Sequence, residues 1–128
     1  MADLEQVLYV DDDDDIREVA EMALTAVAGL KVCACSSGEE ALTQARACRP
    51  QLILLDVMMP GMDGPTTLAA LREDPELADT PVVFLTAKIQ PAEVERYRSL
   101  GAADVIGKPF DPMTLGEQLR GIWARLDS

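Results

Sequence analysis

The sequence contains no histidine, and only 4% of its residues are aromatic. The absence of histidine excludes catalytic pairs in which an imidazole activates serine or cysteine, and it excludes zinc sites with imidazole ligands. The three cysteines, Cys33, Cys35 and Cys48, are an odd number without the spacing of metal ligands. In a reducing compartment we expect all three to remain thiols, packed as small buried hydrophobic residues.

Positive charge is scarce as well. The 11 lysine and arginine residues stand against 23 aspartate and glutamate residues, which gives a formal net charge of -12. Such a balance disfavours direct binding to nucleic acid or to an anionic membrane, so we expect a protein partner instead. No apolar run is long enough to cross a bilayer, and residues 1–6 lack the basic and apolar regions of a signal peptide. The sequence therefore predicts a cytoplasmic protein.

Five apolar runs of strand length alternate with segments of helical periodicity. A chain of 128 residues is long enough for one domain with its own core, so we expect a single domain over residues 1–128. The nearly continuous apolarity of the runs is typical of strands buried on both faces. The alternation predicts an α/β fold, a doubly wound (βα)5 domain with right-handed crossovers and a last helix over residues 113–126. The expected strands cover residues 7–10, 30–34, 52–55, 82–85 and 103–106.

Charged side chains follow three of these runs. Asp11 and Asp12 follow the first, Asp56 follows the third, and Lys108 follows the fifth. Because the carboxyl ends of parallel strands lie on one edge of the sheet, we expect these groups to converge. Asp56 precedes a turn-rich loop, so we expect it to be presented rather than buried. Three carboxylates close together favour a divalent cation, Mg2+ or alternatively Mn2+.

Five consecutive aspartates, residues 11–15, stand at a junction between a strand and a helix. The first two belong to the predicted cation site. For Asp13, Asp14 and Asp15 we favour a role at the helix N-terminus, where carboxylates accept backbone hydrogen bonds and complement the helix dipole.

A carboxylate can accept a phosphoryl group and form an aspartyl phosphate. Asp56 is the candidate nucleophile. Asp12 is a candidate direct metal ligand, whereas Asp11 would act through water or as an orienting charge. Met58 would contribute only its backbone carbonyl to the metal, because a thioether is too soft for Mg2+.

The remaining parts of such a site follow the fourth and fifth strands. Thr86 ends an apolar run and offers a hydroxyl to the phosphoryl group. Ala87 is small and leaves room for a backbone N–H contact with that group. Lys108 would supply a positive charge to the phosphoryl oxygens.

Four separated motifs in this order resemble the receiver domain of two-component response regulators, the CheY-like domains, over nearly the whole chain. The resemblance implies a flavodoxin-like sheet of strand order 2-1-3-4-5 and a cis peptide bond before Pro109. It also implies phosphorylation by a sensor histidine kinase or a histidine phosphotransfer protein. The motifs are Val10-Asp11-Asp12, the segment 55–64, Leu85-Thr86-Ala87 and Lys108-Pro109-Phe110.

The resemblance also implies a role for each site residue. Asp11 and Asp12 would be the acidic pair, Asp56 the phosphoacceptor, Thr86 the switch hydroxyl and Lys108 the phosphate-contacting lysine. A domain of this kind is not an enzyme acting on a separate substrate but a signalling receiver that catalyses its own phosphorylation and dephosphorylation. Since this chain has no histidine, the phosphohistidine must belong to a partner.

One position departs from the family pattern. Val105 stands where the family often has an aromatic residue whose rotamer follows the threonine, and a β-branched valine cannot swing a ring. Output must then use backbone shifts, another side chain or loop reordering.

The candidate output surface comprises the fourth helix, the fifth strand and the fifth helix, where Tyr97 and Trp123 either contact a partner or cover the core. Lys88 either shields the phosphoryl group or is a solvated surface lysine.

Partners beyond the phosphodonor stay open. The output is either a downstream protein target or an effector domain absent from this chain, with no direct contact to nucleic acid or membrane. The chain is either a stand-alone regulator or a receiver cut from a longer protein.

Three other hypotheses concern the same acidic residues. Asp11 and Asp13 also resemble the nucleophile motif of haloacid-dehalogenase-like phosphatases, but that hypothesis needs a late acidic pair and leaves Asp56 without a role. A calcium loop starting at Asp11 fails, because Ile16 stands where it requires glycine and Met22 where it requires glutamate. A receiver-like docking scaffold that is never phosphorylated remains an alternative.

Overall fold

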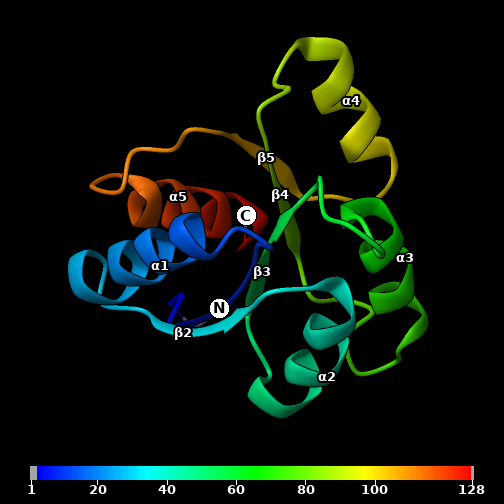
Figure 1. Cartoon of the computed structure of the whole chain (residues 1–128), viewed down its shortest axis with the longest axis horizontal. Helices are drawn as coiled ribbons and strands as arrows, with labels where there is room; N and C mark the ends of the chain where they lie inside the picture. Colours follow the sequence, from blue (N-terminus) through cyan, green and yellow to red (C-terminus); the bar gives the residue numbers. More distant parts are fainter. Residues whose placement is uncertain (1–2, 128) are drawn as a thin grey trace.

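The structure, a computed structural model, describes residues 3–127 and contains a five-stranded parallel sheet with helices on both faces (Figure 1). The strand order is β2-β1-β3-β4-β5, which confirms the flavodoxin-like prediction. Every predicted strand end is correct to within one residue. Residues 1, 2 and 128 of the predicted domain lie outside the described part. The strands are β1 (Gln6–Val10), β2 (Lys31–Cys35), β3 (Leu52–Asp56), β4 (Val82–Thr86) and β5 (Asp104–Gly107).

Two layers of helices enclose the sheet (Figure 1). One face is covered by α1 and α5, whose apolar residues form one core cluster with the strands. The other face is covered by α2, α3 and α4, which contribute to a second cluster. The helices are α1 (Asp14–Met22), continued by the π-helical turn η1 (Ala23–Val27), then α2 (Gly38–Cys48), α3 (Gly64–Glu73), α4 (Pro91–Ser99) and α5 (Leu115–Asp127).

Helices begin soon after the strand ends because polar side chains cap them. Asp13 accepts hydrogen bonds from the N–H groups of Asp15 and Ile16, which confirms its predicted place at the N-terminus of α1. Ser37 caps α2 in the same way. The last helix begins two residues later than predicted, since residues 112–114 form a turn in which the Asp111 carboxylate accepts the N–H of Met113.

Strand register brings the polar ends of the strands together. Val10 lies opposite Leu55 in the β1–β3 pair, so the next residues, Asp11 and Asp56, lie side by side at the same edge. On the other side of β3, Asp56 pairs with Leu85, the residue before Thr86. Thr86 in turn pairs with Gly107, the residue before Lys108. A single edge of the sheet therefore carries all four polar groups.

The cysteines correct one prediction. Cys33 in β2 and Cys48 at the end of α2 form a disulfide, so the expectation of three thiols is wrong for two of them. Cys35 is free and buried, as expected of a small hydrophobic residue. The pairing arises because α2 runs back along β2 and brings its last residue beside the middle of the strand. A sequence separation of 15 residues gives no hint of that return path.

Gly64 fixes the start of α3 against the strand that carries Asp56. Its N–H donates to the carbonyl of Val57, and a Cβ at this position would lie 2.8 Å from the Asp56 carbonyl oxygen and 2.8 Å from the Val57 Cα. Backbone atoms cannot move aside as a flexible side chain can. The close approach therefore requires glycine.

We expect Gly64→Ala to lower the free energy of unfolding by about 1–3 kcal/mol, because overpacking forces the loop away from β3. Gly121→Ala is the matched control, since a Cβ there meets no atom within 4 Å. Alanine in this exposed helical position should stabilise the protein by roughly 0.5–1 kcal/mol. Urea denaturation of the two variants measures both effects, and equal changes in the two would contradict the packing argument.

Candidate functional site

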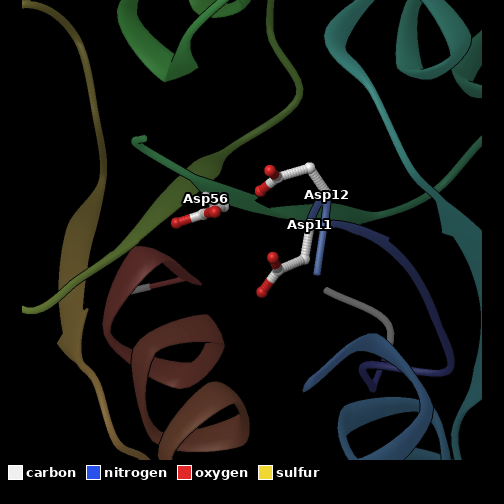
Figure 2. Close-up of side chains that lie close together, drawn as sticks. All are labelled: Asp11, Asp12 and Asp56. Carbon is white, nitrogen blue, oxygen red and sulfur yellow. The ribbon is translucent and has the colours of Figure 1, made fainter. Parts of the chain in front are cut away.

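Three carboxylates gather at the carboxyl edge of the sheet. Asp11 and Asp12 follow β1 and Asp56 ends β3, and one oxygen from each lies within 4.8 Å of the others. Figure 2 shows the three side chains grouped at the ends of these two strands. Asp11 and Asp56 are buried, whereas Asp12 is exposed. The predicted convergence of these acids is confirmed.

Lys108 is the positive charge that faces this cluster. Its Nζ lies 3.0 Å from Asp56 Oδ1 and 3.1 Å from Asp11 Oδ2. Burial alone would lower the pKa of Lys108, but the hydrogen bond to Asp56 and the charge of Asp11 hold it above its ordinary value. The lysine is therefore a cation that bridges two carboxylates. The peptide bond between Lys108 and Pro109 is cis, as the resemblance implied.

Asp11 is held by more partners than the sequence suggested. The Tyr9 hydroxyl donates to Asp11 Oδ2 at 3.0 Å, and the N–H of Asp13 donates to Asp11 Oδ1 at 3.0 Å. Burial, together with the charge of Asp11, raises the pKa of Tyr9, so this hydroxyl remains a donor. With both oxygens engaged, Asp11 fits an indirect role toward a cation better than Asp12 does.

Sequence reasoning missed Tyr9. A usable signal was present, because residues two apart in a strand share one face of the sheet and Tyr9 precedes Asp11 by two. In the sequence, Tyr9 stands inside the apolar run of residues 7–10. Its side chain is fully buried, and its hydroxyl forms a hydrogen bond with Asp11 inside the core.

The prediction that Asp56 is presented rather than buried is wrong, because its relative exposure is 4%. The residue is still the last of β3 rather than part of the loop, so β1, β4 and Lys108 surround it. Burial raises the pKa of Asp56 to about 6, an effect that the hydrogen bond from Lys108 opposes and the charge of Asp11 increases. Asp56 is thus a shielded carboxylate that faces a small cleft.

That cleft has a volume of about 240 Å³ and contains every residue of the predicted site. Thr86 is buried at the end of β4, and its Oγ1 accepts the N–H of Lys88 at 3.1 Å. The side chain of Met58 is 69% exposed, and its backbone carbonyl remains a predicted ligand. The lining residues are Asp11, Asp12, Asp13, Ile16, Asp56, Met58, Thr86, Ala87 and Lys108.

An acidic pair beside a strand-end aspartate, with a lysine bridging the two, is the arrangement that the receiver resemblance implied. Residues 7–120 match the family described as the response regulator receiver domain. The chain belongs to this family. Membership decides against the haloacid-dehalogenase-like alternative, and Asp13 is already engaged as a helix cap.

Similar proteins agree with this assignment. The transcriptional regulatory protein CseB of Streptomyces coelicolor is 38% identical over 125 residues, which cover 98% of this chain and 52% of CseB. The DNA-binding response regulator MtrA of Mycolicibacterium paratuberculosis is 37% identical over 123 residues, 96% of this chain and 53% of MtrA. The receiver domain described here therefore spans about half the length of these curated relatives.

A solved structure shares the whole fold. The chemotaxis protein CheY4 of Vibrio cholerae superimposes with a TM-score of 0.85 at 34% identity, covering 93% of this chain and 98% of CheY4. The receiver domain of this chain thus has the size and topology of a CheY-like protein. Function as a receiver of two-component systems follows from the family and these relatives together.

Proposed function

We propose that this receiver domain takes a phosphoryl group onto Asp56 from a phosphohistidine of a sensor histidine kinase or a histidine phosphotransfer protein. The observation that supports the proposal is the Lys108 bridge, with Nζ 3.0 Å from Asp56 and 3.1 Å from Asp11. A partly buried lysine beside two buried carboxylates supplies a positive charge that can attract the oxygens of an incoming phosphoryl group. The adjoining cleft of about 240 Å³ gives a phosphoryl group room at that point.

The donor atoms fit a hard divalent cation. All three clustered side chains offer carboxylate oxygens, the ligands that Mg2+ prefers, and Mn2+ accepts the same set. We assign Asp12 and Asp56 as direct ligands, Asp11 as a ligand through water, and Met58 as a carbonyl ligand. When bound, the cation supplies charge neutralisation to the carboxylates and to the phosphoryl oxygens.

The residues of the domain perform the rest of the transfer. An oxygen of Asp56 attacks phosphorus in line, and the phosphorus–nitrogen bond of the donor breaks with its electron pair left on the imidazole. The ammonium group of Lys108 attracts one phosphoryl oxygen. The Thr86 hydroxyl and the Ala87 N–H donate to others. Because these groups also serve attack by water, the domain catalyses both its own phosphorylation and its dephosphorylation.

Intact mass spectrometry after incubation with acetyl phosphate tests this function. We expect wild type to gain one phosphate only when Mg2+ is present, and Asp56→Asn to gain none. Asp11→Asn should retain slow labelling, because Asp11 orients the cation without bonding to phosphorus. Beryllofluoride, a stable phosphoryl mimic, serves as a second probe if hydrolysis outpaces detection.

Two outcomes contradict the proposal. If label persists in Asp56→Asn but disappears in Asp11→Asn, then Asp11 is the nucleophile. If wild type binds neither phosphate nor beryllofluoride, the domain is a docking scaffold that resembles a receiver.

Phosphorylation must then change the surface without an aromatic switch at Val105. The loop after β4 offers a different route. Thr86 Oγ1 accepts the N–H of Lys88, and the next side chain, Ile89, covers Gly107 so closely that a Cβ there would lie 3.2 Å from Ile89 Cδ1. If Thr86 turns its hydroxyl toward the phosphoryl group, the bond to Lys88 breaks and Ile89 is released from β5. Ile89 would thus replace the missing ring.

Amide NMR spectra with and without beryllofluoride test this route. We expect the signals of Lys88 and Gly107 to shift in wild type and to shift far less in Thr86→Val, an isostere without the hydroxyl. The Val105 amide should follow Gly107, since both lie in β5. Shifts of equal size in both proteins would contradict coupling through Thr86.

An apolar groove of about 470 Å³ adjoins the site and suits the phosphodonor protein. It lies between the start of α1 and the loop after β5, with Ile16 and Val19 on one side and Pro109 and Phe110 on the other. Val19 is 44% exposed, although it is apolar. For a kinase that phosphorylates this domain, we expect Val19→Asp to slow transfer about tenfold or more, the usual loss for an apolar anchor. Labelling by acetyl phosphate should not change, and an equal loss with both donors would contradict docking in this groove.

We further propose that residues 1–128 act as one receiver domain in the cytoplasm, where histidine kinases present their phosphohistidines. Among residues 3–127, no helix has both the length and the apolarity needed to cross a membrane.

The output is a separate protein target or an effector domain joined to the receiver, as the names of CseB and MtrA suggest for those proteins. Tyr97 is buried against Phe84 and belongs to the core, so Val105 and Trp123 are the better candidates for contact with a target.

A further inference from the structure

The disulfide lies in an exposed part of the fold, away from the phosphorylation cleft. Cys33 is in the middle of β2, which is an edge strand of the sheet and pairs with β1. Cys48 is the last residue of α2, and the two Cα atoms are 6.8 Å apart. Both cysteines are partly exposed. Small thiols and disulfides in solution can therefore reach the bond, unlike one enclosed in the core.

The surroundings of the pair suit the reduced form as well. Cys48 Sγ lies 3.7 Å from Oε1 of Gln44, an acceptor for a thiol proton. Cys33 packs against the apolar cluster beneath α2, an environment in which a thiol is as acceptable as a disulfide. The end of α2 keeps other attachments, because Gln6 Nε2 donates to the Cys48 carbonyl and Arg46 pairs with Asp74.

Cys35 differs from this pair in reactivity. It lies two residues beyond Cys33 on the same face of β2, but it is fully buried. Burial and the neighbouring Glu40 carboxylate raise the pKa of the Cys35 thiol to about 12. A thiol that does not ionise near neutral pH is a poor nucleophile in disulfide exchange. Cys35 therefore provides an internal control.

We propose that Cys33 and Cys48 form a reversible redox site that responds to small-molecule disulfides such as oxidised glutathione. One cysteine thiolate attacks the small disulfide, forms a mixed disulfide and releases one thiolate. The second cysteine thiolate attacks the protein sulfur of that mixed disulfide, closes the Cys33–Cys48 bond and releases the other thiolate. Two electrons pass from the cysteines to the small disulfide, and the two protons lost from the cysteines end on the released thiols.

The site controls how firmly α2 is attached. Its N-terminal residue, Gly38, packs against Thr67 and Met62, close to the segment that follows Asp56. Its C-terminal end is the one that oxidation joins to β2. Closing a loop of 15 residues lowers the entropy of the unfolded chain, which corresponds to roughly a hundredfold smaller equilibrium constant of unfolding. Oxidation thus fixes one end of a helix whose other end packs against Met62, in the loop after Asp56.

A titration of the full chain in glutathione buffers tests the proposal. The protein is equilibrated at increasing ratios of oxidised to reduced glutathione and quenched with acid. Free thiols are then alkylated and counted by intact mass spectrometry. We expect two thiols to disappear together within the accessible ratios and to return on reversal, with peptide mapping locating the bond between residues 33 and 48. Cys35→Ala should titrate at the same ratio, and Cys48→Ser should form no internal bond.

Either extreme overturns the proposal. A bond that survives in excess reduced glutathione is a permanent structural disulfide, and thiols that persist in excess oxidised glutathione are not a redox site. Urea denaturation of the oxidised and reduced wild type then measures the attachment of α2. Equal stability of the two forms would contradict the claim that oxidation attaches α2 more firmly. Cys35→Ala should leave the stability difference between the oxidised and reduced forms unchanged. None of these measurements requires phosphorylation, so they are independent of the proposed receiver chemistry.

Discussion

Replacing Lys108 with methionine is expected to lower the free energy of unfolding by about 3–5 kcal/mol in the absence of divalent cations. The lysine faces Asp11 and Asp56 at 3.1 and 3.0 Å, and both carboxylates are buried. Methionine keeps most of the apolar stem but removes the positive charge that lies beside both carboxylates. Without the lysine, the two buried carboxylates either repel each other or share a proton taken from solvent, and both outcomes cost free energy at neutral pH. Urea denaturation in EDTA at neutral pH measures the loss.

Mg2+ provides the informative second arm of this experiment. If the carboxylates hold the cation, saturating Mg2+ should stabilise Lys108→Met more than wild type, because the cation replaces the missing positive charge. Lys88→Met is the matched control. Lys88 is an exposed lysine in the loop after β4, so its replacement should change stability by no more than about 0.5 kcal/mol. A loss in Lys108→Met that Mg2+ does not reduce would contradict a shared charge site.

Asp56→Asn is expected to act in the opposite direction and to stabilise the metal-free protein at neutral pH. In the folded state the pKa of Asp56 is raised to about 6 from the ordinary 3.8, mainly by burial. The folded protein therefore holds this proton more tightly than the unfolded chain does, and stability falls as pH rises between these two values. A shift of this size corresponds to roughly 1–3 kcal/mol above pH 6. Asparagine avoids that cost.

The pH dependence separates this effect from a general change in packing. The stability gained by Asp56→Asn over wild type should be near zero below about pH 4, should grow through pH 6 and should then level off. Asp12→Asn, which removes an exposed carboxylate of the same cluster, should show little change at any pH. Urea denaturation in EDTA across this pH range tests both variants. A gain that is the same at pH 4 and pH 7 would contradict a titrating carboxylate.

Much of the fold was predictable because local and long-range signals agree. The strands are short apolar runs buried on both faces, so their composition alone locates them to within a residue. Capping residues such as Asp13 mark the helix starts. The site was predictable for a topological reason, since parallel strands bring Asp11, Asp56 and Lys108 to one edge whatever their separation in sequence.

The features that sequence reasoning missed depend on packing in three dimensions. The burial of Asp56 follows from its place as the last residue of β3, a difference of one position from the expected strand end. The bond between Cys33 and Cys48 follows from the path of α2 along β2. The hydrogen bond from Tyr9 to Asp11 forms because the strand places the tyrosine hydroxyl beside the carboxylate. Composition and spacing fix neither the burial of Asp56 nor the disulfide, whereas the spacing of Tyr9 and Asp11 indicates a shared face without showing the hydrogen bond.

Chemical location of the phosphoryl group tests the central claim most directly. After incubation with acetyl phosphate and Mg2+, borohydride reduces an aspartyl phosphate to homoserine, and peptide sequencing by mass spectrometry identifies the converted residue. Our proposal predicts homoserine at position 56 and none in samples without Mg2+. Homoserine at position 11, or at no position although beryllofluoride binding shows an intact site, would contradict transfer onto Asp56.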